Sequence, residues 1–544
     1  MSSTLTTLDQ VSGKTFDYII IGGGTAGLVV AARLSEDLSK SVLVLEAGGA
    51  HLDDPNVYLP ASYGKVFGNK EYDWGFTTVP QKHAENTSFF WPRGKGLGGS
   101  SATNFYLWNR PSKEDVNAWE RLGNPGWNWD NFLKYSIRCE TFVPAAEADA
   151  KSERLTYDPK VHGTNGPLAL GFPNKRPGWD ILLQDTLGSL GIPRSWNRSV
   201  HHRLDIFALF SVLGQHPFSS YRATPLTSSF LSALKSPQVL ELSGIGDPKI
   251  LSKIGVETKV DLPTVGTNVQ DHLFAGIVYE VATPDKFHTL DPLLDPKVAE
   301  EQIKLYAQGE GLLTLGIVGI AMAPLKSFSD RAAEIEADPP SGGNLPGLSE
   351  QRAEQVKRLR EGAANAEFVT IPSFYGFPNP PTPGAKHISL CTTLNRPFSR
   401  GTIHATSTDP LAQPEVDPHY FEEDIDRLTY IEQVKFARKI AQTEPFKSII
   451  GREINPGPNV QSDDDISLWL KKYLTTVHHT SSSCSMLPKD KGGVVDNELK
   501  VYGTKGLRVV DLSVVPLIPS AHTQSIVYAV AEQAADIIKG VLKV

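Results

Sequence analysis

The stretch FDYIIIGGGTAGLVVAARLSEDLSKSVLVLEAGG, residues 16–49, decides the fold. Residues 18–21 form an apolar run rich in β-branched side chains, which is typical of a strand buried on both faces. Gly22, Gly24 and Gly27 follow as G-x-G-x-x-G, which gives a tight turn and a bare backbone for a pyrophosphate at a helix N-terminus. The pattern therefore predicts a dinucleotide-binding β-α-β unit.

The residues after the glycines support the same prediction. We expect a helix from Thr25 to about Leu38, in which small residues such as Ala26 allow close packing on a sheet. Residues 41–45 predict a second strand, which ends on Glu46, nineteen residues past the last glycine of the pattern. A carboxylate there accepts hydrogen bonds from an adenosine ribose, and its charge disfavours a 2′-phosphate.

Composition limits the class of protein. A chain of 544 residues can bury two or more large cores, and its net charge of −8 without a long basic run argues against nucleic acid and anionic membranes as partners. Its scattered cysteines, Cys139, Cys391 and Cys484, indicate neither a disulfide framework nor a zinc site, and we predict no other metal site. Because the N-terminus lacks the features of a secretory signal and no stretch approaches a membrane span in length, we expect a cytoplasmic enzyme.

A second glycine-rich stretch, PRGKGLGGSSATNFYLWNR at residues 92–110, carries a family resemblance. It resembles the first signature of the glucose-methanol-choline (GMC) oxidoreductases, which are FAD enzymes acting mainly on alcohols, and includes Gly99, Ser100 and Asn104. Glycines let backbone amides pack flat against a flavin, and Asn104 can hydrogen-bond the ring edge or the ribityl chain. The alternative is a glycine-rich surface loop, which the serines and the asparagine at the family's spacing make less favoured.

Two further stretches resemble family landmarks: residues 232–246 look like the second signature, and VGTNVQDH at 265–272 is similar to a third element. The resemblance implies an α/β fold (α+β overall), with a Rossmann-like FAD-binding domain that is discontinuous in sequence and a sheet-and-helix substrate domain. The expected divisions are a tail at 1–15, FAD-binding parts at 16–160, 221–284 and 471–544, and substrate-domain parts at 161–220 and 285–470.

The substrate domain has its own local signals. Residues 387–394 and 401–405 predict strands, and residues 424–442 predict an amphipathic helix. The charged stretch at 330–361, with PPSGG inside it, is expected to be a surface excursion or lid, and a plain solvated insertion is the favoured of these interpretations.

One departure from the family concerns the region near residue 231. In the family a long segment separates the region that resembles residues 221–224 from the second signature, and it contributes several strands, one of them lining the adenine pocket. Here residues 226–231 run almost directly into 232–234, so these strands are expected to be missing. Loss of strands from a sheet exposes unpaired backbone groups and apolar surface. A truncated, inactive homologue is therefore one hypothesis for this chain.

The catalytic prediction rests on His479 and His522, on loops that bracket an expected strand at 507–511. In the family, the histidine seven residues before a methionine faces the flavin; Met486 places that role on His479, and His522 matches the second active-site position. A neutral imidazole suits a base that takes the hydroxyl proton while a hydride goes to flavin N5. The second histidine would orient the same oxygen. His478 competes for the base role and is ranked second, as a pocket wall.

The remaining assignments follow the resemblance along the chain. Asp511 matches a position near the flavin's ribityl-phosphate region, with a strand-end cap as the alternative, and Thr523 would offer backbone to the pyrimidine edge. Phe105 is also a candidate pocket wall, and further aromatic candidates are Trp91, Phe374, Tyr375 and Phe377. The full cofactor set is Gly22, Gly24, Thr25, Ala26, Gly27, Glu46, Ala47, Trp91, Gly99, Ser100, Asn104, Phe105, Asp511 and Thr523.

The function that the resemblance implies is FAD-dependent oxidation of a primary or secondary alcohol on an aryl or apolar molecule, such as a secondary-metabolite intermediate. Its partners would be the small-molecule alcohol and an electron acceptor, oxygen or another. A second class of function keeps the flavin without redox turnover, because the same scaffold supports hydroxynitrile lyases and photodecarboxylases. Non-covalent FAD is the expected cofactor.

Overall fold

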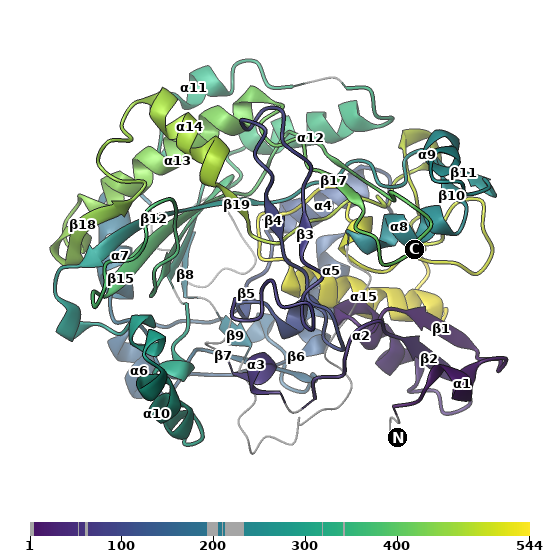
Figure 1. Ribbon diagram of the computed structural model, residues 1–544, viewed down its shortest axis with the longest axis horizontal. Coiled ribbons are helices and arrows are strands. Elements are labelled where there is room, and N and C mark those ends of the chain that lie inside the picture. Colours follow the sequence, from purple (N-terminus) through teal and green to yellow (C-terminus); the bar gives the residue numbers. More distant parts are fainter. Residues whose placement is uncertain are drawn as a thin grey trace.

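The computed structural model describes residues 5–52, 54–59, 64–192, 205–208, 210–212, 233–317, 319–340 and 343–544. The fold is mixed α/β, with a large antiparallel sheet on one side and a bundle around one buried helix on the other (Figure 1). The expected family gap near residue 231 lies outside the described residues.

Within the described ranges, the largest sheet has seven strands in the order β18-β12-β15-β14-β13-β8, with β19 also pairing with β12. All its pairings are antiparallel, and β15 matches the predicted strand at 387–394. The strands are β8 (Asp205–Ala208), β12 (Leu273–Val281), β13 (Gly319–Ala323), β14 (Ala366–Ile371), β15 (His387–Leu394), β18 (Ile450–Asn455) and β19 (Thr475–Thr476).

The two faces of this sheet have different neighbours, because side chains alternate between faces along each strand. Ile277 and Phe368 point into the main core beneath α13, the helix predicted at 424–442. Phe274, Val369 and Ile371 belong to a separate apolar cluster on the opposite face. The helices on this side of the molecule are α7 (Asp180–Ser189), α10 (Pro296–Tyr306), α13 (Asp424–Ala441) and α14 (Asp463–Tyr473).

The N-terminal unit has the predicted β-α-β order: β1 (Tyr18–Ile21), α2 (Thr25–Leu34) and β2 (Val42–Leu45), with β1 and β2 parallel. The helix ends four residues before the expected Leu38, where the Ser35 hydroxyl donates to the Ala31 carbonyl at 2.7 Å. Such back-bonding competes with further helix formation.

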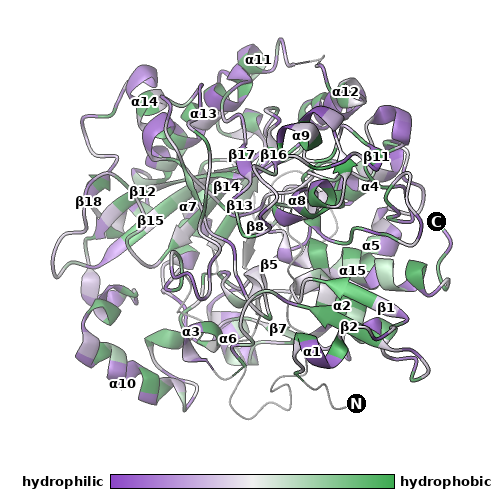
Figure 2. Ribbon diagram, turned by 45° about the vertical axis from the view of Figure 1, so that its right-hand side comes forward, coloured by the Kyte–Doolittle hydropathy of each residue, from purple (hydrophilic) through white to green (hydrophobic). Residues whose placement is uncertain are grey.

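Burial of β1 on both faces was predicted, and this prediction is wrong. Ile19 is 55% exposed and Ile21 is 47% exposed, and Leu45 on β2 is 37% exposed. Tyr18 and Ile20, on the other face, pack against the cluster around α2 and α15. In the described part of the chain this sheet has two strands, so its outer apolar face has no covering layer there (Figure 2).

A long buried helix, α15, lies between the N-terminal β-α-β unit and α5. It contacts α2 and α5 and carries small residues, which permit close packing. The other elements are α1 (Leu8–Val11), α3 (Pro55–Tyr58), α4 (Lys113–Arg121), α5 (Trp129–Cys139), α6 (Glu147–Ser152), α8 (Lys235–Leu242), α9 (Pro248–Lys253) and α15 (Gln524–Ile538).

Short strands complete this side. Among the residues that the structure describes, four strands form a sheet in the order β5-β9-β7-β6, and three two-stranded pairs, β3–β4, β10–β11 and β16–β17, add to the β1–β2 pair. Their bounds are β3 (Phe76–Thr77), β4 (Phe90–Trp91), β5 (Leu107–Trp108), β6 (Glu140–Val143), β7 (Leu168–Gly171), β9 (Phe210–Val212), β10 (Ile245–Gly246), β11 (Val260–Asp261), β16 (Thr402–His404) and β17 (Glu415–Asp417). β16 confirms the core of the strand predicted at 401–405.

Two further predictions are wrong. Residues 330–361 are not a plain solvated insertion, because they form α11 (Ala332–Ile335) and α12 (Leu348–Arg360), and α12 buries much of its polar face. Gln351 accepts a hydrogen bond from Asn268 at 3.0 Å, which ties α12 to the third family element. Residues 507–511 form no strand; Arg508 makes an isolated bridge, and a 3₁₀ turn follows.

Searches of the described residues found no helix with the length and apolar character to span a membrane. They also found no group of three or more histidine, cysteine, aspartate or glutamate side chains that could hold a metal ion. The three cysteines are buried and unpaired with one another.

Candidate active site

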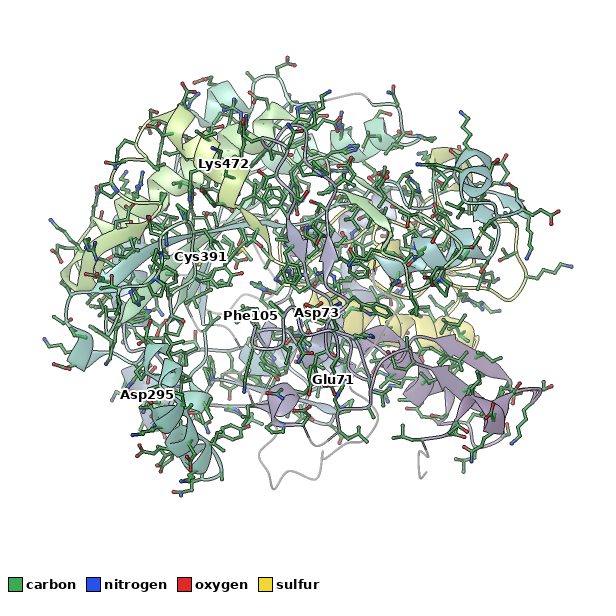
Figure 3. All side chains as sticks on the ribbon, viewed as in Figure 1. Glu71, Asp73, Phe105, Asp295, Cys391 and Lys472 are labelled. Atoms are coloured by element: carbon green, nitrogen blue, oxygen red, sulfur yellow. The ribbon has the colours of Figure 1, made fainter. Side chains whose placement is uncertain are left out.

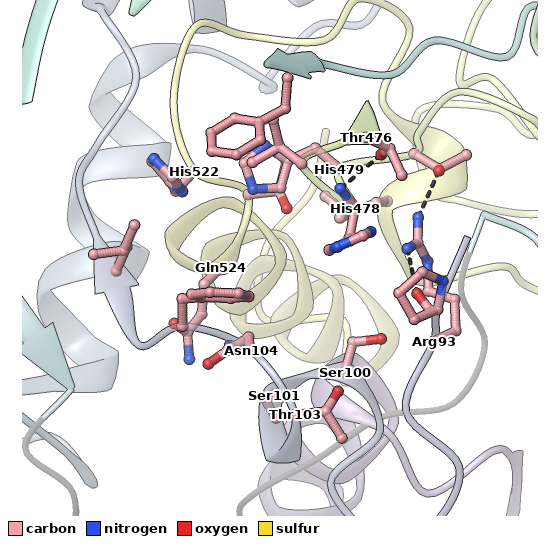
Figure 4. A pocket seen from close by; sticks show the side chains of 18 of the residues that line it. Arg93, Ser100, Ser101, Thr103, Asn104, Thr476, His478, His479, His522 and Gln524 are labelled. Carbon is pink, nitrogen blue, oxygen red and sulfur yellow. Dashed lines mark hydrogen bonds between the residues drawn. The ribbon is translucent and has the colours of Figure 1, made fainter. Parts of the chain in front are cut away.

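A cavity lies between the second face of the large sheet and the N-termini of α2 and α15. Figure 4 shows His478, His479 and His522 on one side and Ser100 and Asn104 on the other. Figure 3 places Phe105 near the middle of the molecule, where its ring belongs to the apolar cluster of the sheet. The apolar part of the lining comprises Phe67, Phe105, Leu107, Phe274, Ile317, Val369, Ile371, Tyr375, Val477 and Val527.

Backbone pairing fixes the loop that carries His479. β19 pairs with the start of β12, and the Val477 amide donates to the His272 carbonyl at 3.0 Å. Ser481 and Gln270 then exchange backbone hydrogen bonds, of 2.9 and 3.2 Å. The third family element therefore runs antiparallel to the histidine loop and aligns it.

The ring of His479 contacts two other histidines. Its Nδ1 lies 2.8 Å from Nδ1 of His272, and its ring centroid is 5.0 Å from that of His522. Burial lowers the pKa of His479 well below its usual value, and the neighbouring His272 and His522 act in the same direction. His479 is therefore neutral near pH 7, the form that can accept a proton.

His522 has a carboxylate partner. Its Nε2 lies 2.9 Å from Oε1 of Glu367, and its backbone amide donates to Asn109 Oδ1 at 2.8 Å. Glu367 is not among the predicted site residues, although a charged residue inside the apolar strand AEFVTI is a signal that marks it.

His478 also lines the cavity, as predicted for the second-ranked base. Its backbone has a φ of +64°, and its ring meets Phe67 edge-on with a centroid distance of 5.2 Å. A positive φ is uncommon for a residue other than glycine, and here it lets two consecutive histidines reach one cavity. Burial lowers the pKa of His478 to about 3.

A buried arginine beside the histidine loop was missed. Arg93 lines the cavity, is 5% exposed, and donates from its guanidinium to the Thr480 hydroxyl at 2.5 Å and to the Pro92 carbonyl at 2.8 Å. Asp271 lies nearby, accepting from the His479 amide at 3.1 Å and from the Tyr420 hydroxyl. Burial raises the pKa of Asp271 to about 6, and Arg93 opposes that rise.

The glycine turn fits a dinucleotide. A Cβ on Gly27 would lie 2.2 Å from the Gly22 carbonyl oxygen, so the helix and strand approach as closely as the fingerprint requires. Gly24 is the N-cap of α2, and Thr25 at its first turn lines the cavity. The exposed amides of a helix N-terminus attract a pyrophosphate.

Glu46, the predicted ribose contact, lies beside this turn. Its carboxylate accepts hydrogen bonds from the Gly23 and Gly48 amides, at 2.8 and 2.7 Å. The backbone amides of Ala47 and Gly96 also interact with this carboxylate, so Glu46 holds the two glycine-rich turns together.

The other predicted residues separate into three groups. Those that line the cavity are Thr25, Ser100, Asn104, Phe105, Asp511 and Thr523, together with the two catalytic candidates. Those not among the lining residues are Gly22, Gly24, Ala26, Gly27, Glu46, Ala47 and Gly99, in or beside the two glycine-rich turns. Trp91, Phe374 and Phe377 also do not line it. Trp91 is fully buried in the main core and donates to the Tyr420 hydroxyl at 3.1 Å, while Phe377 is 57% exposed.

Asp511 does not cap the end of a strand, because residues 507–511 form none, and its predicted place near the flavin stays a prediction. It caps the 3₁₀ turn by accepting from the Ser513 amide at 2.6 Å, and it also lines the cavity. Its other oxygen accepts from the Ser236 hydroxyl at 2.5 Å, which ties the cavity to the second family signature. Burial raises the pKa of Asp511 above its usual value.

Comparison with known proteins gives one consistent family. Family models described as GMC oxidoreductase match residues 16–192 and 397–531. A GMC oxidoreductase family protein of Malassezia sympodialis, Mala s 12, is 33% identical over 602 residues, covering 98% of this chain and 93% of that protein. An FAD-dependent oxidoreductase from Chaetomium thermophilum superposes with a TM-score of 0.84 at 26% identity, over 97% of this chain and 99% of the other. A fungal aryl-alcohol oxidase gives a TM-score of 0.79 at 26% identity, over 96% and 98%.

Proposed function

The chain belongs to the GMC oxidoreductase family and takes FAD as its cofactor, and on that premise we propose that it oxidises a primary or secondary alcohol on an aryl or otherwise apolar molecule. A GMC oxidoreductase needs a small-molecule substrate and an electron acceptor. The observation that carries the proposal is the pair of histidine rings, His479 and His522, 5.0 Å apart in a cavity whose walls are largely apolar.

The proposed domain roles follow the two sides of the molecule. We assign FAD binding to the β1–α2–β2 unit, the second glycine-rich turn and the N-terminus of α15, which together form a Rossmann-like domain. The substrate then binds against the large sheet, where Phe274, Val369 and Ile371 face the cavity. Apolar walls bind aromatic and aliphatic groups through burial, which supports the aryl or apolar class.

In the proposed mechanism the chain's own residues manage the hydroxyl proton. His479 is neutral, and with its Nδ1 directed at His272 its Nε2 is the ring nitrogen left to accept a proton from the substrate. His522, fixed by Glu367, orients the same oxygen. FAD, when bound, supplies the electron sink for the hydride. The apolar walls limit water at the reacting carbon.

The substrate class agrees with the aryl-alcohol oxidase named among the similar structures. Intermediates of secondary metabolism also include apolar alcohols of this kind, and we extend the proposal to them by analogy. The acceptor is oxygen or another oxidant.

The test is anaerobic reduction of the bound flavin. We expect aryl alcohols to bleach the visible flavin bands of the purified protein, and His479→Ala to slow that reduction by about 100-fold or more, since general base catalysis contributes that much. His83→Ala, an exposed histidine, is the matched control and should bleach at the wild-type rate. Protein that keeps its flavin but is bleached by no alcohol would contradict the proposal and favour a non-redox relative. Protein that binds no flavin would favour the truncated, inactive homologue.

A further inference from the structure

We propose that His272 is a positioning residue, which accepts a hydrogen bond from Nδ1–H of His479 and so keeps Nε2 of His479 unprotonated toward the cavity. This inference rests on the proposed function, because it concerns the residue assigned there as the base. His272 is the last residue of the VGTNVQDH element, whose backbone aligns the histidine loop.

The contact is built into the backbone. His272 directly precedes β12, and its carbonyl accepts from the Val477 amide at 3.0 Å, two residues before His479. The adjacent Asp271 accepts from the backbone amide of His479 itself. Neighbouring residues therefore hold both the backbone and the ring of His479. His272 is 1% exposed and does not line the cavity, so its ring has no room to turn away from His479.

Two neutral imidazoles that meet through Nδ1 can bond in only one of two ways. If His272 donates, Nδ1 of His479 is the acceptor, and His479 must carry its own proton on Nε2, where it cannot act as a base. If His479 donates, its Nε2 keeps a free lone pair. The distance of 2.8 Å requires that one ring donate, since two lone pairs or two protons at that separation repel. The contact thus fixes the tautomer of the base.

The proposed role of His479 as the base requires the second arrangement, in which His272 accepts through Nδ1 and carries its own proton on Nε2. Burial lowers the pKa of His272 to about 3, with His522 and Arg396 adding to the effect and Asp115 opposing it. His272 therefore stays neutral, which leaves one of its ring nitrogens without a proton and able to accept a hydrogen bond.

The two catalytic candidates thus have unlike partners. His522 meets the carboxylate of Glu367 through Nε2, and a carboxylate always accepts, so that ring keeps a proton on Nε2. His479 meets a second imidazole, which can accept without adding a negative charge. A neutral His522 is then unprotonated at Nδ1, so the two partners fix opposite tautomers in the two rings.

The first measurement is nitrogen-15 NMR of the full chain labelled in its histidine rings, with the His479 signals identified by their loss in His479→Gln. We expect wild-type His479 to show a protonated Nδ1 and an unprotonated Nε2. In His272→Leu the signals should move toward the opposite or a mixed tautomer, whereas His272→Asn, which places a polar atom near the Nδ1 position, should restore them. His387→Leu removes an equally buried histidine at the far end of β15 and should leave the His479 signals unchanged.

The second measurement compares kinetics. We expect His272→Leu to lower kcat about tenfold, the factor for one hydrogen bond, with KM and FAD content within about twofold of wild type. His272→Asn should recover most of that loss. A protonated Nε2 in wild-type His479 would overturn the inference. So would a His272→Asn variant that loses FAD and rate together, because the histidine would then be structural. If no alcohol is oxidised at all, the proposed function fails, while the NMR result still decides the tautomer.

Discussion

The large sheet and the β1–β2 pair contain similar apolar strands in opposite surroundings. Ile277 and Phe368 in the large sheet are fully buried, whereas Ile19 and Ile21 in β1 are 55% and 47% exposed. The large sheet has helices on one face and the cavity lining on the other. The small sheet has α2 and α15 on one face and, among the described residues, nothing on the other. The burial of a strand therefore depends on layers supplied from elsewhere in the chain.

The comparison with the Malassezia protein bears on this difference. The match extends over 602 residues, more than the 544 of this chain, so that relative carries residues that this chain lacks. Loss of neighbouring strands exposes the edge of a sheet, whereas loss of a layer packed on the sheet exposes its face. The missing segment near residue 231 stays a prediction.

The largest expected difference between the two sheets is in stability. Phe368→Ala removes a fully buried ring from the main core under α13, and we expect a loss of about 3–5 kcal/mol in the free energy of unfolding. Calorimetry of the FAD-loaded protein would measure it as a lower Tm of the corresponding transition. A loss below about 1 kcal/mol would mean that this core repacks around the missing ring. Burial in the large sheet would then contribute no more to stability than the exposed residues of β1 do.

Local patterns predicted local structure well. The glycine pattern placed β1, the start of α2 and β2, and a strand-like run placed β15 at residues 387–394. These signals lie within a few residues of the structure they specify. Burial is a different quantity, because it depends on residues far away, and for that reason an apolar run at 18–21 could not reveal its exposed face.

The site was predictable only in part, because the sequence pattern marks single residues and not the distant residues that contact them. The family resemblance identified His479 and His522, which the structure brings within 5.0 Å of each other. Their partners, His272 and Glu367, lie 207 and 155 residues away along the chain, on strands of the large sheet or next to them. The pairing itself leaves no local pattern in one sequence, although a charge inside the apolar strand AEFVTI marks Glu367 as a residue that needs a partner. The buried face of α12 was missed likewise, since its charged residues find distant partners such as Glu423 for Arg352.

A smaller effect is expected from a buried carboxyl group in α7, one of the helices that pack on the large sheet, and it appears as a dependence of stability on pH. Asp180 begins α7 beside β13, is buried, and has no hydrogen-bond partner for either carboxylate oxygen among the described residues. Burial, with a smaller contribution from Glu153, raises its pKa from 3.8 to about 7. Between these values the folded state keeps the proton that the unfolded state loses, so this group lowers stability as pH rises from about 4 to 7.

Asp180→Asn keeps the shape and removes the titration. We expect the variant to be more stable than wild type at pH 8, by on the order of 2 kcal/mol, and to differ little from it at pH 4. Urea denaturation at the two pH values measures the difference. If Asp180→Asn changed the free energy of unfolding equally at pH 4 and pH 8, the Asp180 carboxyl would not titrate between these pH values. Asp185→Asn, an exposed residue of the same helix, is the control and should show no such dependence.

The smallest expected effect is on the open face of β1. Ile19→Thr and Ile21→Thr keep β-branched side chains, which suit a strand, and exchange exposed apolar surface for a hydroxyl. We expect each to change the free energy of unfolding by less than about 0.5 kcal/mol, as surface substitutions do, and to reduce self-association in analytical ultracentrifugation. A loss of about 2 kcal/mol or more would show that the face is covered in solution. The loss would then be measured at several protein concentrations. A loss that disappears on dilution would mean that a second copy of the chain covers the face, and a loss that does not change would mean that a segment of the same chain covers it.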